Sequence, residues 1–322
     1  MEKVKVTGTD LLSSSLALGG VPFGSKLNDE QSFALMDAYA DYGGNMVDTA
    51  EVYANWLPGE QSVSESTIGK WMKSRGNRNH LIVTTKGAHP RMSTMHISRM
   101  SPQDIREDVE GSLGRLQVDH IDLYWLHRDD RNRDVGEIVE SLNALVREGK
   151  IRYFGLSNWT TDRIREAQAY AASHGLQPFS ANQPMWSLAS VDLSQAEDQT
   201  LVAMDEGMFA LHREAGLTAI PYSSQAQGLF TKLAEGRLSL DDDTAAPMYR
   251  SDSNRMKLGR IRTLAEEKGI AVSQLVLSYM LSQPFPTIPI IGCHSHAQLE
   301  DSIQADKVRL TEEEVAFLDL RA

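Results

Sequence analysis

Short apolar runs alternate along the chain with longer segments in which apolar residues recur at helical spacing. The runs are too short for helices and are rich in β-branched and aromatic residues, which is typical of buried strands. Strands that alternate with helices form a parallel sheet, and eight of them close a (β/α)8 barrel. The pattern therefore predicts an α/β fold of the TIM-barrel class. The expected strands cover residues 16–18, 45–48, 81–86, 121–126, 153–156, 179–182, 218–222 and 287–290.

The segments between these strands carry helix start and stop signals. Asn28 or Asp29 can cap a helix that runs to Tyr42, where two glycines end it. Ser101 followed by Pro102 opens another helix, whose apolar residues follow the helical period. Further helices are expected at residues 135–146, from 160 or 161 onward, and at 254–268, 273–281 and 312–320.

Three stretches do not follow the alternation: residues 54–61, 185–199 and 227–248. Long loops are uncommon in compact domains and often cover sites, although each of these could be a surface insertion. No linker or internal repeat divides the chain, so residues 1–322 are expected to form one domain.

Charge and cysteine content narrow the possible partners. With 32 Lys and Arg against 44 Asp and Glu, the net charge is −12, which disfavours nucleic acids and anionic membranes. The one cysteine, Cys293, supports neither an internal disulfide nor a zinc site, and no metal site is predicted. Without a signal peptide or an apolar stretch of about 20 residues, we expect a cytoplasmic protein. Its oligomeric state is left open.

Ionisable side chains recur where the predicted strands end. Asp48 and Lys86 close two strands, His127 follows the next, and Tyr53 lies on the loop after Asp48. A parallel barrel gathers these strand ends on the face that carries active sites. Each residue alone could be a helix cap, a packing residue or a solvated strand end. Their occurrence at three consecutive strand ends predicts one shared site.

The chemistry of these four side chains suits proton transfer to an oxygen atom. Tyrosine titrates near pH 10, and a neighbouring lysine cation lowers that pKa. An aspartate beside Lys86 keeps the lysine charged and oriented. His127 can donate a hydrogen bond to the same substrate oxygen. The set fits the reduction of a carbonyl group, in either direction.

Polar residues also follow the later strands, at Ser157, Asn158, Gln183 and Tyr222. Their amide and hydroxyl groups suit a carboxamide, and the Tyr222 ring offers a flat surface for stacking. Ser157 and Asn158 could equally well be ordinary hydrogen-bonding loop residues.

Three motifs carry a resemblance to a known family. Residues 48–53 read Asp-Thr-Ala-Glu-Val-Tyr, which resembles the Asp-Thr-Ala-x-x-Tyr signature of the aldo-keto reductases. Residues 113–127 resemble the Leu-x-x-Leu-x-x-x-x-x-Asp-Leu-x-x-x-His element of that family, and residues 149–158 resemble its Gly-Lys-Ile-Arg…Gly-x-Ser-Asn stretch. The match covers nearly the whole chain. It implies a barrel that binds an extended nicotinamide cofactor without a Rossmann domain, in agreement with the missing Gly-x-Gly-x-x-Gly fingerprint.

The resemblance also implies roles for individual residues. Tyr53 would be the proton donor, Lys86 and Asp48 would tune it, and His127 would position the carbonyl. The implied cofactor residues are Ser157, Asn158 and Gln183 at the carboxamide, Tyr222 at the nicotinamide ring, Ser223, Gln225 and Gly228 along the pyrophosphate, and Gly292, His294, Ser295, Gln298, Asp301 and Ser302 at the adenosine end.

The adenosine-end segment departs from the commoner family pattern. His294 and Gln298 stand where many relatives carry arginine, and Asp301-Ser302 replaces Glu-Asn. Arginine binds a 2′-phosphate through a bidentate fork that neither His nor Gln reproduces. Family habit favours NADP(H), and NAD(H) is the alternative.

Residues just beyond the catalytic positions are candidates for substrate contact. They are Asn55, Trp56, His89, Arg128 and Trp186. The two tryptophans could instead pack loops onto the barrel. No long tail follows the helix expected at 312–320, so we expect an open, polar pocket suited to sugars or other hydroxylated carbonyls.

The sequence thus predicts an NAD(P)-dependent oxidoreductase that transfers a hydride between nicotinamide and an aldehyde, ketone or sugar, acting on CH–OH donors in the reverse direction. Two alternatives use the same barrel. One is a cofactor-binding regulatory subunit, and the other is a redox-cycling epimerase or lyase that retains its cofactor.

Overall fold

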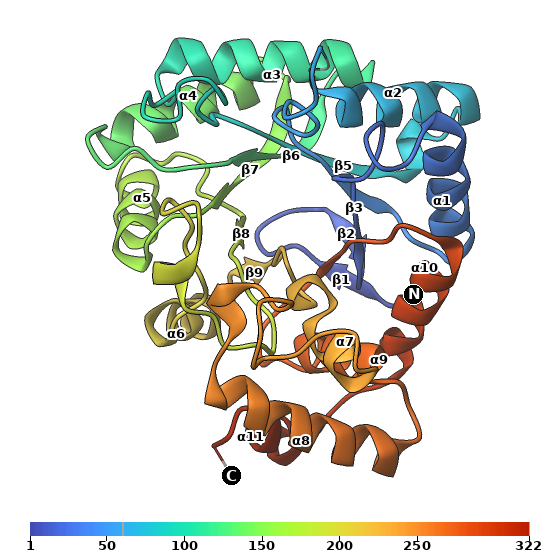
Figure 1. Cartoon of the computed structure of the whole chain (residues 1–322). Helices are drawn as coiled ribbons and strands as arrows, with labels where there is room; N and C mark the ends of the chain where they lie inside the picture. The colour runs from blue at the N-terminus through green and yellow to red at the C-terminus, as the bar shows by residue number, and fades with distance from the viewer. Residues whose placement is uncertain (60, 322) are drawn as a thin grey trace.

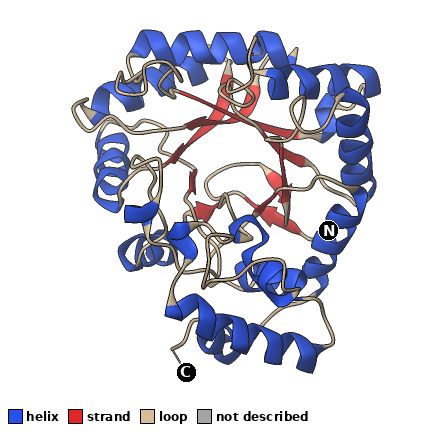
Figure 2. Ribbon diagram, in the orientation of Figure 1, coloured by secondary structure: helices blue, strands red, loops and turns tan. Residues whose placement is uncertain are grey.

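A ring of parallel strands surrounded by helices forms the centre of the computed structural model, which describes residues 1–59 and 61–321 (Figure 1, Figure 2). The strands pair in the order β10-β3-β4-β5-β6-β7-β8-β9. Ala219 N donates to Pro286 O at 2.9 Å and Ile288 N to Ala219 O at 2.8 Å, which joins the two ends of the sheet. The predicted (β/α)8 barrel is confirmed. Its strands are β3 (Ala17–Gly19), β4 (Met46–Asp48), β5 (Ile82–Gly87), β6 (Ile121–Leu126), β7 (Ile151–Ser157), β8 (Ala181–Gln183), β9 (Thr218–Ala219) and β10 (Ile290–Ile291).

Each predicted strand overlaps one of these, but β9 and β10 are shorter than expected. β9 ends at Ala219, two residues before Pro221, and β10 begins directly after Pro289. Proline has no N–H to donate to a neighbouring strand, so regular pairing stops at these positions. The apolar character that predicted longer strands reflects burial rather than ladder hydrogen bonds.

Helices cover the outside of the ring, and two of their predicted caps are present. The Asn28 side chain accepts from Gln31 N at 2.9 Å, and Ser101 Oγ accepts from Asp104 N at 3.1 Å. The helices are α1 (Asp29–Asp41), α2 (Val63–Arg75), α3 (Pro102–Leu116), α4 (Val135–Arg147), α5 (Thr161–Ser173), α6 (Glu206–Ala215), α7 (Leu229–Ala234), α8 (Asp252–Lys268), α9 (Val272–Leu281), α10 (His296–Gln304) and α11 (Glu312–Leu318). Short 3₁₀ turns lie at η1 (Arg78–His80), η2 (Leu193–Gln195), η3 (Ala226–Gly228), η4 (Pro247–Tyr249) and η5 (Ala305–Lys307). Within the described residues, none of these helices combines the length and apolar character that a bilayer span needs.

The sequence pattern did not indicate α2, α6 or α10, and α7 lies inside a stretch expected to be irregular. The start of α2 shows why such a helix is hard to recognise. Ser62 precedes it in the left-handed region, with φ of 51°, and makes no side-chain cap. Its beginning therefore lacks the hydrogen-bond signature that marks a helix in a sequence.

An antiparallel hairpin, which was also not predicted, precedes the barrel. It pairs β1 (Lys3–Lys5) with β2 (Leu12–Ser14). Val6 and Leu11, between these strands, are buried in one apolar cluster with barrel residues such as Met46 and Trp125. Thr7 N donates to the side chain of Thr218, at the start of β9, at 2.9 Å. The hairpin therefore closes the end of the barrel where the strands begin.

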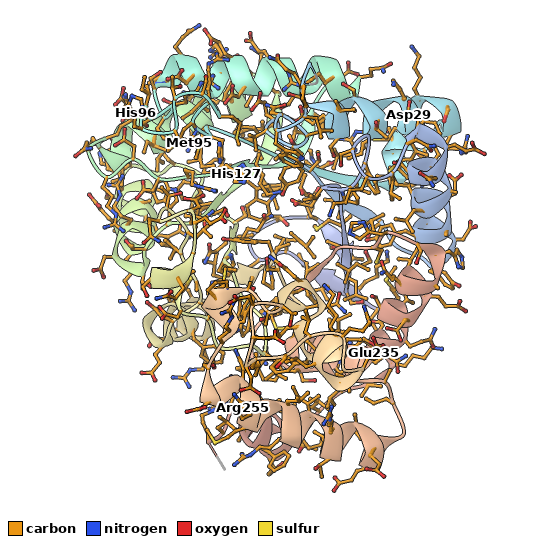
Figure 3. All side chains as sticks on the ribbon, viewed as in Figure 1. Asp29, Met95, His96, His127, Glu235 and Arg255 are labelled. Carbon is orange, nitrogen blue, oxygen red and sulfur yellow. The ribbon has the colours of Figure 1, made fainter. Side chains whose placement is uncertain are left out.

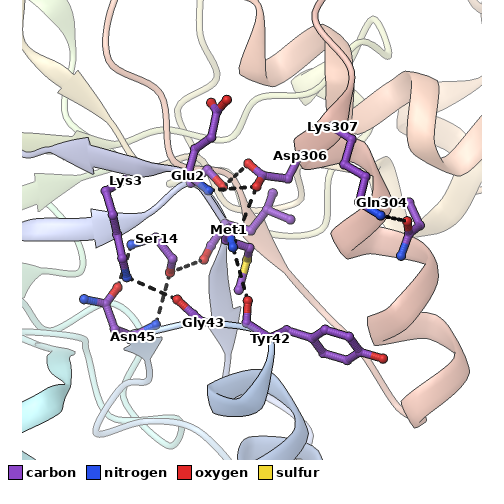
Figure 4. Close-up of polar contacts among 12 residues, drawn as sticks. Met1, Glu2, Lys3, Ser14, Tyr42, Gly43, Asn45, Gln304, Asp306 and Lys307 are labelled. Carbon is purple, nitrogen blue, oxygen red and sulfur yellow. Dashed lines mark hydrogen bonds and ion pairs between the residues drawn. The ribbon is translucent and has the colours of Figure 1, made fainter.

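Polar contacts attach this hairpin to distant parts of the chain (Figure 4). Ser14 N donates to Asn45 Oδ1 at 2.6 Å, just before β4. Glu2 N donates to Asp306 Oδ2 at 2.8 Å, in the turn after α10. These contacts hold the hairpin over the end of the barrel where the strands begin. The opposite end, where the strands finish, is not covered by the hairpin and carries the candidate site.

Candidate active site

The four predicted catalytic residues meet at the carboxyl ends of adjacent strands. Asp48 is the last residue of β4, Lys86 lies near the end of β5, and His127 follows β6 directly. The parallel register pairs Asp48 with Thr84 and Lys86 with Trp125, so the three residues are staggered by two positions from strand to strand at the same end of the barrel. Figure 3 shows His127 toward the middle of the molecule.

Lys86 connects the other members of the set. Its Nζ donates to Asp48 Oδ2 at 2.5 Å, to Thr49 O at 2.8 Å and to Tyr53 Oη at 3.1 Å. These three bonds use all the protons of the ammonium group. Because the side chain is only 2% exposed, water does not compete for them.

The other carboxylate oxygen of Asp48 is also fully engaged. Thr84 Oγ1 donates to Asp48 Oδ1 at 2.6 Å, and Gln183 Nε2 donates to the same oxygen at 3.1 Å. The buried carboxylate is therefore paired with a cation and satisfied by neutral donors, which is what a buried charge requires.

The electrostatics keep Lys86 charged and Tyr53 protonated. Burial alone would lower the pKa of Lys86, but Asp48 and Tyr53 outweigh it and the net pKa is raised. For Tyr53, burial raises the pKa more than the Lys86 cation lowers it, and Asp48 adds to the rise. The lowered pKa of Tyr53 that the neighbouring lysine predicts is therefore wrong, because the cost of burying a phenolate exceeds the effect of the lysine cation.

His127 is held by its backbone. Its N–H donates to Gly87 O at 2.9 Å, and its carbonyl accepts from Asn158 Nδ2 at 3.1 Å and from Arg128 Nη1 at 2.8 Å. Burial, followed by the charge of Arg128, holds the pKa of His127 well below its usual range, so the ring is neutral.

The ring nitrogens of His127 differ in their surroundings. Nδ1 is buried and has no hydrogen-bond partner among the described residues. A buried N–H without a partner is costly, so we assign the single proton of the neutral ring to Nε2. The ring stands edge-on to Tyr53, with 6.2 Å between the ring centroids.

The predicted carboxamide residues form a connected group beside this site. Asn158 is largely engaged with the protein: Tyr222 Oη donates to its Oδ1 at 2.8 Å, and its Nδ2 donates to Ser157 Oγ at 3.1 Å. Ser157 Oγ in turn donates to Gln183 O at 2.8 Å. The Gln183 Oε1 atom, in contrast, is buried without a partner within the described part of the chain. It is a free acceptor of the kind that a carboxamide NH₂ needs.

The candidate pyrophosphate residues lie on an irregular turn between Tyr222 and α7. Ser223 and Gly228 adopt left-handed backbone angles, with φ of 53° and 77°, as do Ala226 and Gln227 between them. Gln225 lies in the middle of this turn, immediately before η3.

The structure separates the adenosine-end candidates into two groups. Gln298 Oε1 accepts from His294 N at 2.7 Å, and Ser295 Oγ accepts from Gln298 N at 3.3 Å, so these three cluster at the start of α10 beside exposed Gly292. Ser302 is buried instead, and Asp301 accepts from Gln274 of α9 at 2.8 Å. The last two therefore do not join the cluster.

Two lysines that the sequence pattern did not indicate lie close to that cluster. Burial lowers the pKa of His294, and the charges of Lys26 and Lys232 lower it further. Lys232 Nζ donates to Gln227 O at 2.8 Å, in the left-handed turn. Lys26 lies in the loop before α1 and Lys232 in α7, and this wide separation in the chain gave no signal because only the closed barrel brings the two segments together.

A cavity of about 440 Å³ opens beside the Tyr53 loop. Its lining includes the predicted substrate residues Asn55 and His89, as well as Glu51 and Arg99, which were not predicted. Trp56 stands next to Tyr53, with a centroid distance of 6.5 Å, and is 48% exposed. Asn55 therefore lines this cavity, whereas Trp56 packs beside Tyr53 and is not among the lining residues.

The other two substrate candidates are engaged with the protein. Arg128 donates to Asp198 Oδ2 at 2.7 Å and to Thr200 Oγ1 at 2.7 Å. Trp186 is buried against Phe209 and Phe285 and lines a different cavity, of about 1040 Å³. The packing role considered for Trp186 is the one its contacts support, and Arg128 anchors the loop after β8.

No group of three or more His, Cys, Asp or Glu side chains with metal-binding geometry occurs among the described residues.

The sequence also matches a known protein family. The model of the aldo/keto reductase family matches residues 15–320. The chain belongs to the aldo/keto reductase family. Its members are oxidoreductases that use nicotinamide cofactors, typically NADPH.

Three named relatives are similar over more than nine-tenths of this chain. The uncharacterized oxidoreductase YrpG of Bacillus subtilis is 31% identical over 99% of this chain and 95% of its own length. Norsolorinic acid reductase B of Dothistroma septosporum is 30% identical over 95% of this chain and 77% of its own length. A probable aryl-alcohol dehydrogenase, AAD4 of Saccharomyces cerevisiae, is 28% identical over 91% of this chain and 88% of its own length.

Proposed function

We propose that this aldo/keto reductase transfers a hydride between NADP(H) and a small carbonyl or alcohol, with Tyr53 as general acid and base. The observation that carries the proposal is the buried ammonium of Lys86, which binds both Asp48 and the Tyr53 hydroxyl. An arrangement of this kind places a proton and a compensating charge at one point.

In the direction of reduction, a bound nicotinamide would supply a hydride to the carbonyl carbon. The Tyr53 hydroxyl gives its proton to the carbonyl oxygen, whose π-electron pair becomes the new O–H bond. Lys86 stabilises the phenolate that remains, which then regains a proton from solvent. The Nε2 proton of His127 donates a hydrogen bond to the same oxygen and orients it. Oxidation of an alcohol reverses each of these steps.

The residues around Gln183 suit the nicotinamide group. The free Oε1 of Gln183 would accept from the carboxamide NH₂, and the Tyr222 ring would stack on the pyridine ring. Ser157 and Asn158 would support this arrangement through their mutual hydrogen bond. Ser223, Gln225 and Gly228 would follow the pyrophosphate.

The proposed preference for NADP(H) is supported by two lysine charges near the adenosine end, since none of the residues proposed there is an arginine that could bind a 2′-phosphate through two hydrogen bonds. His294, Ser295 and Gln298 form the end of the proposed cofactor site, with Lys26 and Lys232 close by. Two ammonium groups can neutralise a 2′-phosphate as point charges. A 2′-hydroxyl has no charge to neutralise, so NADH would gain little from them.

We expect Lys232→Met to weaken NADPH binding about tenfold and to change NADH binding by less than about twofold. Titration of each cofactor against the protein, followed by fluorescence, measures both dissociation constants. Lys73→Met, at an exposed lysine of α2, is the matched control. An equal loss for the two cofactors would contradict a role in phosphate binding.

The proposed function itself is tested by turnover. Purified protein is mixed with aldehydes, ketones and sugars, and the absorbance of the reduced nicotinamide is followed with NADPH and with NADH. We expect consumption of the reduced cofactor with at least one carbonyl class and a higher kcat/KM with NADPH. The absence of turnover across the panel with both cofactors would refute the proposal.

A further inference from the structure

His89 lies beside the proposed catalytic residues but has no part in the proton transfer described above. It follows β5 three residues after Lys86, and its ring centroid is 4.8 Å from that of His127. The residue is only 6% exposed and lines the 440 Å³ cavity together with Asn55. Tyr53, Lys86 and His127 are not among the residues that line this cavity, so His89, which contacts His127, lies between the cavity and the proposed site of the reacting carbonyl.

The loop that carries His89 is held from outside the barrel. Ala88 has a left-handed backbone, with φ of 59°, and its N–H donates to Asp108 Oδ2 at 2.8 Å. Arg99 in turn donates to Asp108 Oδ1 at 2.7 Å. This buried ion pair fixes the backbone before His89, so the orientation of the imidazole is imposed by the fold.

The protonation of the His89 ring follows from its hydrogen bond. Nδ1 lies 2.6 Å from Pro90 O, and a carbonyl oxygen can only accept, so Nδ1 carries a proton. Burial and the nearby charge of Arg128 lower the pKa of His89, which leaves the ring neutral with that single proton. Nε2 is then a lone pair, and no donor from the described residues pairs with it.

The Nε2 atoms of the two neighbouring imidazoles thus differ in character, a donor on His127 and an acceptor on His89. His127 presents an N–H, which suits a carbonyl oxygen, whereas His89 presents an acceptor. An acceptor in this position is satisfied by a substrate group that carries a hydrogen, next to the oxygen that His127 binds. A hydroxyl on the carbon adjacent to the reacting carbon meets this requirement.

We propose that His89 Nε2 accepts a hydrogen bond from an α-hydroxyl group, so that the preferred substrates are α-hydroxycarbonyls or, in the oxidative direction, vicinal diols. The inference rests on the proposed function and refines its substrate class. The rest of the cavity agrees with a hydroxylated ligand, because Glu51, Gln61 and Ser93 also line it.

The test compares 2-hydroxypropanal with propanal, which differ in the one hydroxyl group. With NADPH as cofactor, we expect wild-type kcat/KM to favour 2-hydroxypropanal about tenfold. In His89→Phe, which keeps a flat ring without the acceptor, this ratio should fall to about one. In His89→Gln, whose amide oxygen replaces the acceptor, part of the ratio should return.

His96→Phe is the matched control, since His96 is an exposed histidine of the loop that follows His89. It should keep the wild-type ratio. A wild type that turns over both aldehydes without preference would overturn the inference and leave the proposed function standing. The inference would also be overturned, with the proposed function left standing, if His89→Phe lowered kcat/KM for both aldehydes equally. His89 would then only support the position of His127. Absence of turnover of either aldehyde, together with the wider panel, would refute both.

Discussion

Replacing Tyr53 with phenylalanine is expected to lower kcat about 10²- to 10⁴-fold, the range that one general acid contributes. The ring can remain where it is, 4.8 Å from Lys86 Nζ and edge-on to His127, but the proton is lost. Hydride transfer would then leave an unprotonated alkoxide beside Lys86. Steady-state rates at saturating carbonyl and cofactor, followed by nicotinamide absorbance, measure the effect.

Cofactor binding separates this chemical effect from damage to the site. The dissociation constant for NADPH should stay within about threefold of wild type, since no role in cofactor binding is proposed for the Tyr53 hydroxyl. Tyr153→Phe removes a hydroxyl at the other end of the barrel, where it bonds Asp10 at 3.1 Å, and should leave kcat unchanged. A Tyr53→Phe enzyme with wild-type kcat would exclude Tyr53 as the proton donor.

Replacing Lys86 with methionine is expected to have the largest effect on stability. The change leaves Asp48 buried without its cation, and loss of one partner of a buried ion pair costs about 3–5 kcal/mol. The Tyr53 hydroxyl loses its donor at the same time, so activity should fall as well. Urea denaturation followed by tryptophan fluorescence gives the free energy of unfolding.

Two comparisons isolate the buried charge as the cause. The double variant Lys86→Met with Asp48→Asn should recover much of the stability, because a neutral amide can still accept from Thr84. Lys70→Met breaks an exposed pair with Asp29 of 2.8 Å and should cost less than about 1 kcal/mol. If Lys86→Met unfolds at the wild-type urea concentration, the buried pair does not stabilise the fold.

The barrel was predictable because its strands are short apolar runs in a regular alternation with helices. The hairpin could not be predicted, because Lys3 and Lys5 of its first strand look like solvated residues in the sequence. Val6 and Leu11 are buried only because the closed ring leaves an opening that they fill. Such burial depends on contacts between residues far apart in the chain, which local patterns do not contain.

The catalytic set was predictable for a related reason. The strands of a parallel barrel all end on the same face, so Asp48, Lys86 and His127 were expected to lie together, and the register places them at that end of β4, β5 and β6. The ion pair of Arg128 with Asp198 could not be predicted, because Asp198 lies on a loop with no regular sequence pattern. The same applies to the direction of the Tyr53 pKa, which depends on how deeply the phenol is buried.

The full set of hydrogen bonds around Lys86 has a chemical consequence for an enzyme proposed to handle aldehydes. A lysine with a free amine condenses with aldehydes to form imines, and lysines that do so have a depressed pKa. Lys86 has a raised pKa, and its three protons are held by Asp48, Thr49 and Tyr53. It therefore has no lone pair to offer, and the amine nearest to the reacting carbonyl is protected from covalent capture by the substrate.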